Sequence, residues 1–221
     1  TTPGTVALKA ASPTVPRNVG ASLFFWAGQL WRGDGTEAGT VAVTAFQGTA
    51  STFGLLNLHA IGSRLLFRYN EFVYDIWSSD GTAAGTSLLA GLTTNTEGTA
   101  FANSNGQAFF WAADTYLGVE KLRKSDGTSA GTLTVQDSGA VPQVSAPFGV
   151  ARFADANGTL FFTGRAAGSG EELWKTDGRS AGTMLVKDIF PGPAESYIGS
   201  LANVNGTLSF GAAATAVLGT A

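Results

Sequence analysis

WKTDGRSAGT, at residues 174–183, is one of four copies of a single phrase that decides the fold. The other copies are WRGDGTEAGT at 31–40, WSSDGTAAGT at 77–86 and RKSDGTSAGT at 123–132. By residue number, the aspartates of the phrase follow one another at intervals of 46, 46 and 51 residues; they are Asp34, Asp80, Asp126 and Asp177. A period of this length is typical of one supersecondary unit that stacks on its neighbours.

A second, apolar phrase precedes each copy and occurs once more near the C-terminus. Its five occurrences are ASLFFW at 21–26, SRLLFR at 63–68, GQAFFW at 106–111, GTLFFT at 158–163 and GTLSFG at 206–211. The sequence opens with PGTVALKA at 3–10, which matches AGTMLVKD at 181–188 and is therefore the tail of a repeat without its head. The fifth apolar phrase supplies that head, so both ends of the sequence are expected to share one unit.

Each unit contains short runs of alternating or continuous apolar residues between turn residues, which indicates strands. The fourth unit predicts strands at 149–156, 159–164, 171–176 and 184–189. The Asn157-Gly158 pair is typical of a two-residue hairpin turn, because both residues tolerate a positive φ. Four strands in about 44 residues match one blade of a β-propeller.

The sequence therefore predicts an all-β fold, a five-bladed β-propeller of four-stranded blades in a single domain, 1–221. The predicted blades cover about 14–46, 55–92, 98–138, 149–189, and 199–221 together with 3–10. The last is a split blade, whose N-terminal outer strand ties both ends into the ring and leaves no free edge. Because both faces of a blade pack on neighbours, both faces of each second strand should be apolar. One face carries Phe25, Phe67, Phe110, Phe162 and Phe210, and the other carries Phe24, Leu66, Phe109 and Phe161, with Ser209 as the exception.

Composition excludes several classes of function. The net charge is −3 and there is no run of Lys or Arg, which argues against nucleic-acid binding. Cysteine is absent and His59 is the only histidine, so we expect no disulfide, no thiolate or histidine-rich metal centre and no cofactor. No apolar run approaches the ~18–20 residues that span a bilayer, so membrane insertion is not expected.

The phrase EELWKTDGRSAGTMLVKDI at 171–189 resembles the ELWxxDGT repeat family of large bacterial exported and surface proteins, whose consensus is ELWxxDGTxxGTxLVKDI. The resemblance extends over essentially the whole sequence, although Gln29 replaces the glutamate in the first copy and Arg123 replaces the tryptophan in the third. It implies a secreted or cell-surface protein and carries no catalytic residues. Size and blade number also resemble the five-bladed tachylectin-type lectins.

The recurring aspartates, Asp34, Asp80, Asp126 and Asp177, have two interpretations. A ring of carboxylates could bind calcium, but each copy offers one carboxylate where calcium takes six to eight oxygens. In D-G-T-x-x-G-T the carboxylate can instead accept hydrogen bonds within its own turn, and the first glycine can take a positive φ. We interpret these aspartates as structural turn residues and predict no metal site.

The aromatic residues supply the candidate ligand contacts. Trp31, Trp77 and Trp174 recur at one strand position, which favours packing between blades. Trp26 and Trp111 follow the double phenylalanine in only two copies, so packing and ligand stacking both remain open for them. The candidate ligand-binding residues are Trp26, Tyr69, Trp111, Tyr116 and Tyr197.

These patterns predict a non-enzymatic, exported module for binding or surface assembly, with glycan recognition as the leading specific function. Its expected partners are glycans, other surface proteins or further copies of itself. One alternative is a purely structural subunit of a larger extracellular assembly. Another is a five-bladed glycoside hydrolase, which needs two facing carboxylates from outside the repeat. The non-repeating acids available for that role are Glu71, Asp75, Glu97, Asp114 and Asp155.

Overall fold

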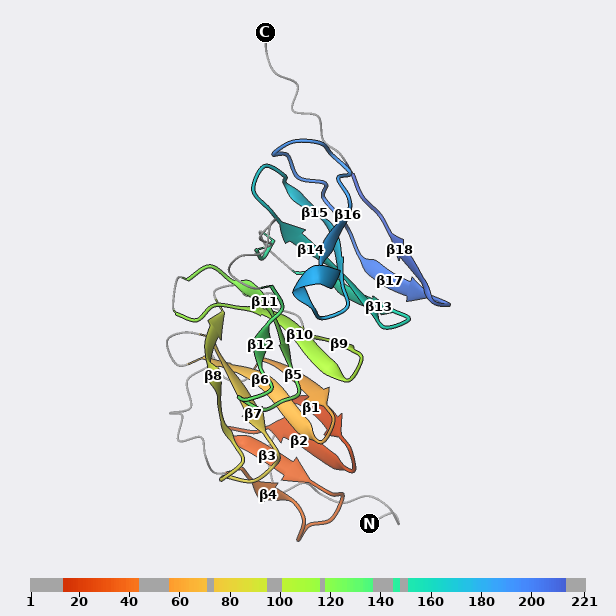
Figure 1. The fold of residues 1–221 in the computed structure, drawn as a ribbon. Helices are drawn as coiled ribbons and strands as arrows, with labels where there is room; N and C mark the ends of the chain where they lie inside the picture. The colour runs from red at the N-terminus through yellow and green to blue at the C-terminus, as the bar shows by residue number, and fades with distance from the viewer. Residues whose placement is uncertain are drawn as a thin grey trace. The chain divides into compact units, whose positions relative to one another are not determined.

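A computed structural model describes residues 14–43, 56–70, 74–94, 101–115, 118–136, 145–147 and 151–213 (Figure 1). The chain divides into two compact units, which are described separately. The first comprises Thr1–Thr94 and Ser125–Thr132, and the second comprises Asn95–Lys124 and Leu133–Ala221. Strands dominate both units, and the helix within the described ranges is one short 3-10 turn, η1 (Ser180–Gly182). No helix in this part of the chain could span a membrane.

The first unit contains two four-stranded antiparallel sheets, each formed by strands paired in chain order. The first strands of the two sheets, β1 and β5, lie side by side (Figure 1). The strands are β1 (Thr14–Val19), β2 (Ser22–Trp26), β3 (Leu30–Gly33), β4 (Val41–Ala42), β5 (Leu56–Ile61), β6 (Arg64–Asn70), β7 (Tyr74–Ser79) and β8 (Ser87–Thr94).

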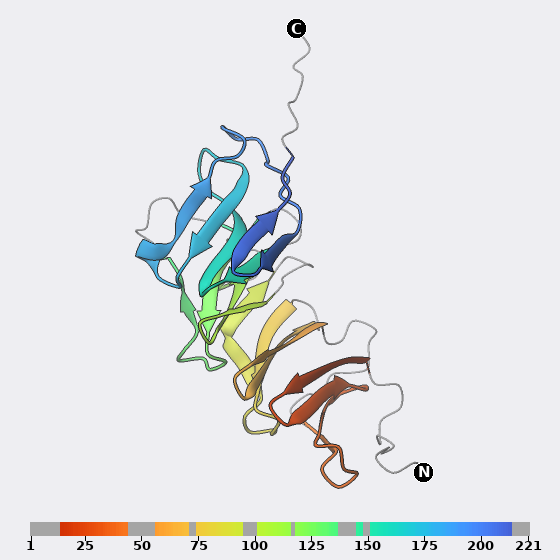
Figure 2. The same cartoon turned by 90° about the vertical axis from the view of Figure 1, so that its right-hand side faces the viewer.

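The second unit contains two further four-stranded sheets and a hairpin, also paired in chain order. The first strands again lie beside one another, with β9 and β17 flanking β13 (Figure 2). The strands are β9 (Ala102–Ser104), β10 (Gln107–Ala112), β11 (Lys121–Ser125), β12 (Leu133–Thr134), β13 (Phe153–Ala156), β14 (Thr159–Arg165), β15 (Glu171–Thr176), β16 (Met184–Lys187), β17 (Leu201–Val204) and β18 (Thr207–Phe210).

The prediction of an all-β fold built from four-stranded antiparallel sheets is confirmed. In the fourth unit, β15 has the predicted bounds, whereas β13 starts at Phe153, four residues later than expected. The Asn-Gly hairpins form as predicted: Asn157 has a φ of 53° and Gly158 a φ of 77°. Two successive left-handed residues match the right-handed twist of the paired strands, which explains why the sequence uses this dipeptide.

The second strands form the core, because their side chains are apolar on both faces. Phe24, Phe25, Leu66 and Phe67 are buried in the first unit. In the second unit Phe109, Phe110 and Phe162 are buried, whereas Phe161 is only half-buried. The fifth copy differs: Phe210 is 41% exposed on a hairpin of two strands. The predicted outer strand at 3–10 and the stretch 214–221 lie outside the described residues, so the split blade stays a prediction.

Candidate functional site

The antiparallel topology gives each sheet two chemically different ends. In the sheet β13–β16, the hairpin at Asn157-Gly158 and the turn at 177–183 lie at one end, which we call the turn end. The β14–β15 connection at 166–170 and the residues that follow β16 lie at the other, which we call the loop end. The turn end is where the repeated phrase folds, whereas the sequence of the loop end differs between copies.

At the turn end, each described aspartate of the phrase is used by its own turn. In the second copy, Asp80 Oδ1 accepts hydrogen bonds from the Thr82 amide at 2.9 Å and the Thr82 hydroxyl at 2.7 Å. The Thr82 hydroxyl accepts in turn from the Gly85 amide at 3.0 Å, and the Thr86 hydroxyl donates to the Thr82 carbonyl at 2.7 Å. The first and third copies repeat these four contacts.

The two glycines of the phrase are required for different reasons. The first takes a positive φ in every copy, with values of 92°, 89°, 92° and 88° at Gly35, Gly81, Gly127 and Gly178. The second, represented by Gly85, lies directly against the aspartate, so that a Cβ there would overlap the Asp80 carboxylate. The same clash recurs in the other copies, which explains the D-G-x-x-x-G spacing by geometry alone.

The hydrogen bonds of the turn favour the ionised form of the carboxylates in the first three copies. The Thr36 hydroxyl, followed by the Thr36 amide, lowers the pKa of Asp34 below its usual value. Thr82 and Thr128 lower the pKa of Asp80 and Asp126 in the same way. In the fourth copy Arg179 replaces the threonine, and among the described residues Asp177 accepts a hydrogen bond from the Arg179 amide alone, at 2.9 Å. Within the described ranges, no group of three or more ligating side chains is placed to hold a metal ion.

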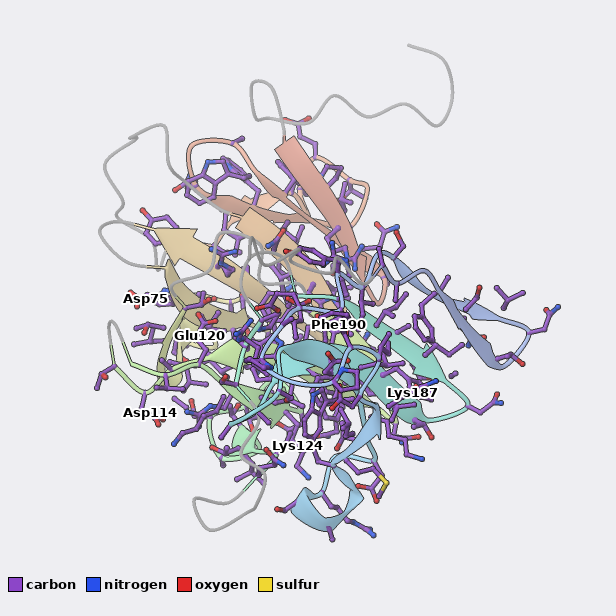
Figure 3. The ribbon with its side chains drawn as sticks, turned by 90° about the horizontal axis from the view of Figure 1, so that it is seen from above. Asp75, Asp114, Glu120, Lys124, Lys187 and Phe190 are labelled. Atoms are coloured by element: carbon purple, nitrogen blue, oxygen red, sulfur yellow. The ribbon has the colours of Figure 1, made fainter. Side chains whose placement is uncertain are left out.

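The loop end of the sheet β13–β16 is covered by residues 188–200, which we call the β16–β17 segment. Its start is marked by the labelled residues Lys187 and Phe190 in Figure 3. Gly170 donates its amide hydrogen to the Gly192 carbonyl at 3.1 Å, and Ser196 donates to the Glu171 carbonyl at the same distance. The β16–β17 segment is therefore held on the first residues of β15 by main-chain hydrogen bonds.

Two acidic side chains, Glu172 and Glu195, add to this attachment, and a third, Glu171, lies beside them. Glu172 is fully buried; its Oε2 accepts from the Ile189 amide at 2.8 Å, and its Oε1 accepts from the Ser196 hydroxyl. Glu195 Oε2 accepts from the Glu171 amide at 2.8 Å, and its Oε1 forms an ion pair with Arg165. Burial, and then the negative charge of Glu195, raise the pKa of Glu171 above its ordinary value.

Tyr197 is the most accessible of the four candidate ligand contacts that the structure describes. Its exposed fraction is 60%, whereas its neighbours Ser196 and Ile198 are 0% and 2% exposed. Its φ is 39°, a left-handed conformation that is rare for a bulky side chain and is tolerated only where the surrounding structure imposes it. The β16–β17 segment thus presents one aromatic ring to solvent from a fixed backbone.

The other three described candidates, Trp26, Tyr69 and Trp111, are less available. Trp111 is fully buried against Phe162, with ring centroids 5.8 Å apart, so neither of its faces is open to a ligand. Tyr69 is 7% exposed and lies 6.0 Å from the partly buried ring of Trp26, measured between centroids. Tyr116 lies outside the described residues. The repeated tryptophans pack: Trp174 donates to the Gly164 carbonyl at 3.2 Å, and Trp31 stacks on Phe25.

The described contacts of the non-repeating acids considered for glycoside hydrolysis do not involve the β16–β17 segment. Asp155 accepts from the Ser104 hydroxyl at 2.5 Å and the Gly158 amide at 3.3 Å, which places it at a hairpin of the turn end. Asp114, labelled in Figure 3, forms an ion pair with Arg123 at 2.7 Å. Asp75 lies on β7, whereas Glu71 and Glu97 are outside the described residues.

The sequence analysis did not select Glu171, Glu172 or Glu195 as site residues. Glu171 and Glu172 belong to the repeated phrase and so did not stand out, and no local motif links them to Glu195.

Arg123 also has a structural explanation. It replaces the repeated tryptophan and is 6% exposed. Its guanidinium donates to the Ala112 carbonyl at 3.3 Å and to the Thr134 hydroxyl at 2.6 Å, in addition to its ion pair with Asp114. The three partners compensate the buried charge of Arg123, which explains how this exception to the repeat is tolerated.

No protein-family model matches the sequence, and no curated protein is similar enough to match it. Among solved structures, a puromycin hydrolase matches with a TM-score of 0.47 and 15% identity, over 93% of this chain and 36% of that one. An exo-beta-1,3-galactanase from Phanerochaete chrysosporium, solved with beta-1,3-galactotriose, matches with a TM-score of 0.36 and 10% identity. That match covers 80% of this chain and 49% of the galactanase chain. This chain therefore spans about a third and about half of their lengths, and likenesses this weak support no conclusion about its function.

Proposed function

We propose that this protein is an exported, non-catalytic β-propeller module of the ELWxxDGT type that binds glycans at the loop end of its sheets. One observation carries the proposal: Tyr197 is 60% exposed and left-handed between two buried neighbours. A rigid aromatic ring offers a flat apolar face for the C–H side of a sugar ring at a low cost in conformational entropy.

Polar groups that hold the same segment support the same ligand class. The ion pair of Arg165 and Glu195 is partly exposed, with 21% and 27% of the two side chains accessible. Charged donors and acceptors held by other contacts can hydrogen-bond sugar hydroxyls without first being ordered. The β16–β17 segment thus offers both an exposed aromatic ring and charged groups held by other contacts, the kinds of group that an uncharged, hydroxyl-rich ligand requires.

The fold that we propose is a ring of five four-stranded blades, with residues 3–10 as the outer strand of the fifth. Its support is that contacts between neighbouring sheets repeat. Asn105 Nδ2 donates to the Gly158 carbonyl at 2.6 Å, and one sheet further on Asn157 Nδ2 donates to the Gly206 carbonyl at 3.1 Å. Deleting residues 1–9 should open the ring and lower the melting temperature sharply. An unchanged melting temperature would count against the split blade.

A second candidate function, assembly into a larger surface structure, is favoured by the outer strands. The fourth strand of each described four-stranded sheet exposes apolar side chains: Val41, Leu88, Leu133, Met184 and Val186. However, β4 and β12 are two residues long, which leaves little backbone for pairing with another chain. Sedimentation over a range of concentrations distinguishes the two functions, since a strictly monomeric protein argues against assembly.

The direct test of the proposed function is a glycan array probed with the purified protein, with and without a calcium chelator. We expect selective binding that the chelator does not change, because the described turn carboxylates are occupied by their own turns. Binding that disappears with the chelator would overturn our interpretation of the aspartates. An array without any binding would overturn glycan recognition and favour assembly.

A further inference from the structure

Glu172 is a fully buried acid at the loop end of the sheet β13–β16. It follows Glu171 on β15, and its two oxygens are used by the β16–β17 segment alone among the contacts described: one by Ser196 and the other by Ile189. A buried carboxylate is tolerated only when hydrogen bonds replace its lost hydration. The segment supplies those bonds, so the segment and Glu172 each fix the other.

The two bonded residues bracket the part of the segment that leads to Tyr197. Ile189 lies at the start of the segment, and Ser196 directly precedes the tyrosine. Glu195, one residue earlier, is held by the Glu171 amide and by Arg165. The backbone on the N-terminal side of Tyr197 is therefore attached to β15 at two consecutive residues.

This attachment accounts for the conformation of Tyr197. A tyrosine with a φ of 39° is strained, and such strain persists only where neighbouring contacts cost more to break than the strain itself. Ser196 and Ile198 are buried on either side, so the chain cannot relax by moving the tyrosine inward. The only direction left for the ring is outward.

We propose that Glu172 is a positioning residue, which holds the β16–β17 segment so that Tyr197 is presented to a glycan in a preformed orientation. This inference rests on the proposed function for its ligand and on the structure for its geometry. The advantage of such an arrangement is affinity, because a loop that is already ordered loses less entropy on binding. Glu172 acts through Tyr197 and does not touch the ligand.

The first test needs no ligand. Glu172→Gln keeps the size of the side chain and can still accept from Ser196, but its amide group cannot accept from the Ile189 N–H. Tyr197→Gly removes the backbone strain, since glycine adopts a positive φ freely. We expect Tyr197→Gly to raise the melting temperature more, or lower it less, in the wild-type background than in the Glu172→Gln background, because the strain that it removes is imposed partly through Glu172. Equal shifts in both backgrounds would overturn the positioning role.

Ser196→Ala is the second variant, in case Glu172→Gln does not fold. It removes the other hydrogen bond to the same carboxylate, and the same comparison with Tyr197→Gly applies. Asp114→Asn is the matched control, because it weakens an ion pair at the loop end of a different sheet. The effect of Tyr197→Gly should be the same in that control as in the wild type.

The second test uses the strongest glycan from the array and measures its affinity by calorimetry. Glu172→Gln should weaken binding by about tenfold in the wild type, through loss of preorganisation, and should weaken it no further in Tyr197→Ala. Equal weakening in both backgrounds would overturn the inference. The array could instead show no glycan binding while Tyr197→Gly still shifts the melting temperature differently in the wild-type and Glu172→Gln backgrounds. That result would overturn the proposed glycan ligand and support the positioning role of Glu172.

Discussion

The ammonium group of Lys124 donates a hydrogen bond to the main-chain carbonyl oxygen of Gly178, 2.7 Å away and 54 residues later in the sequence. The residue two positions before the aspartate of one copy thereby holds the turn that begins at the aspartate of the next copy. Ser78 occupies the same position in the second copy and donates to the Gly127 carbonyl at 2.5 Å. The first glycine of the phrase thus forms its own turn, and in these two copies its carbonyl also accepts a side-chain hydrogen bond from the preceding sheet.

Lys124→Ala should destabilise the second unit by about 1 kcal/mol, the net contribution of a typical hydrogen bond. Urea unfolding of the variant measures the change. Lys187→Ala is the control, because Lys187 is an exposed lysine of β16 that makes no side-chain hydrogen bond to any described residue. Both lysines are labelled in Figure 3. Equal stability of the two variants would contradict a role for the Lys124 contact.

Gly85→Ala should destabilise the protein by about 1–3 kcal/mol, because the added Cβ overlaps the Asp80 carboxylate and the turn must shift. Gly211→Ala is the matched control, since its φ is not positive and its Cβ meets no atom within 4 Å. The control should change stability by less than about 0.5 kcal/mol. Thermal unfolding of both variants provides the comparison, and a tolerated alanine at residue 85 would show that the turn is not held as described.

The contacts of Thr82 should make the free energy of unfolding decrease as the pH falls into the acid range. Its hydrogen bonds lower the pKa of Asp80 in the folded protein, so the unfolded chain binds a proton more readily. The resulting stabilisation is present above the unfolded pKa of about 3.9 and is lost as pH falls through the lower, folded value. Thr82→Val should flatten this loss, and Thr82→Ser should retain it. Urea midpoints measured as a function of pH test the difference, and identical profiles for the two variants would refute the assignment.

Glu171 should produce a pH dependence of the opposite sign. Burial and Glu195 raise its pKa in the folded protein, so the folded state binds the proton more tightly than the unfolded chain does. The associated stabilisation is complete below the ordinary glutamate value of about 4.3 and is lost as pH rises through the folded value. Glu171→Gln should therefore unfold at a higher temperature than the wild type at neutral pH, and this advantage should shrink at acid pH. A constant difference across pH would contradict the sign.

The sequence was sufficient for the features that depend on local pattern. The apolar period marked β14 and β15, and the Asn-Gly pair marked the hairpin between β13 and β14, because strand alternation and left-handed turns depend on neighbouring residues. The need for the second glycine of the phrase was not apparent. It depends on where the aspartate side chain folds back, which the order of residues does not reveal.

The candidate site was predicted only in part. Tyr197 was among five aromatic candidates, but nothing in the sequence separated it from Trp111, whose burial depends on Phe162 more than fifty positions away. The pairing of Glu172 with Ser196 crosses from β15 to a segment beyond β16, so no local motif records it. In the same way Phe210 matches the apolar phrase, yet it is 41% exposed. Burial of a strand residue depends on what packs against the strand, which the phrase itself does not record.

The most direct measurement of the central claim is the affinity of the strongest array glycan for Tyr197→Phe and Tyr197→Ala, compared with the wild type. Phenylalanine keeps the ring face and the backbone strain, whereas alanine keeps the strain and removes the ring. We predict that Tyr197→Phe binds within a few-fold of the wild type and that Tyr197→Ala loses about 1–3 kcal/mol of binding free energy, by analogy with removal of an aromatic residue that stacks on a nucleic-acid base. Wild-type affinity in Tyr197→Ala would contradict the claim that the loop end binds its ligand through this residue.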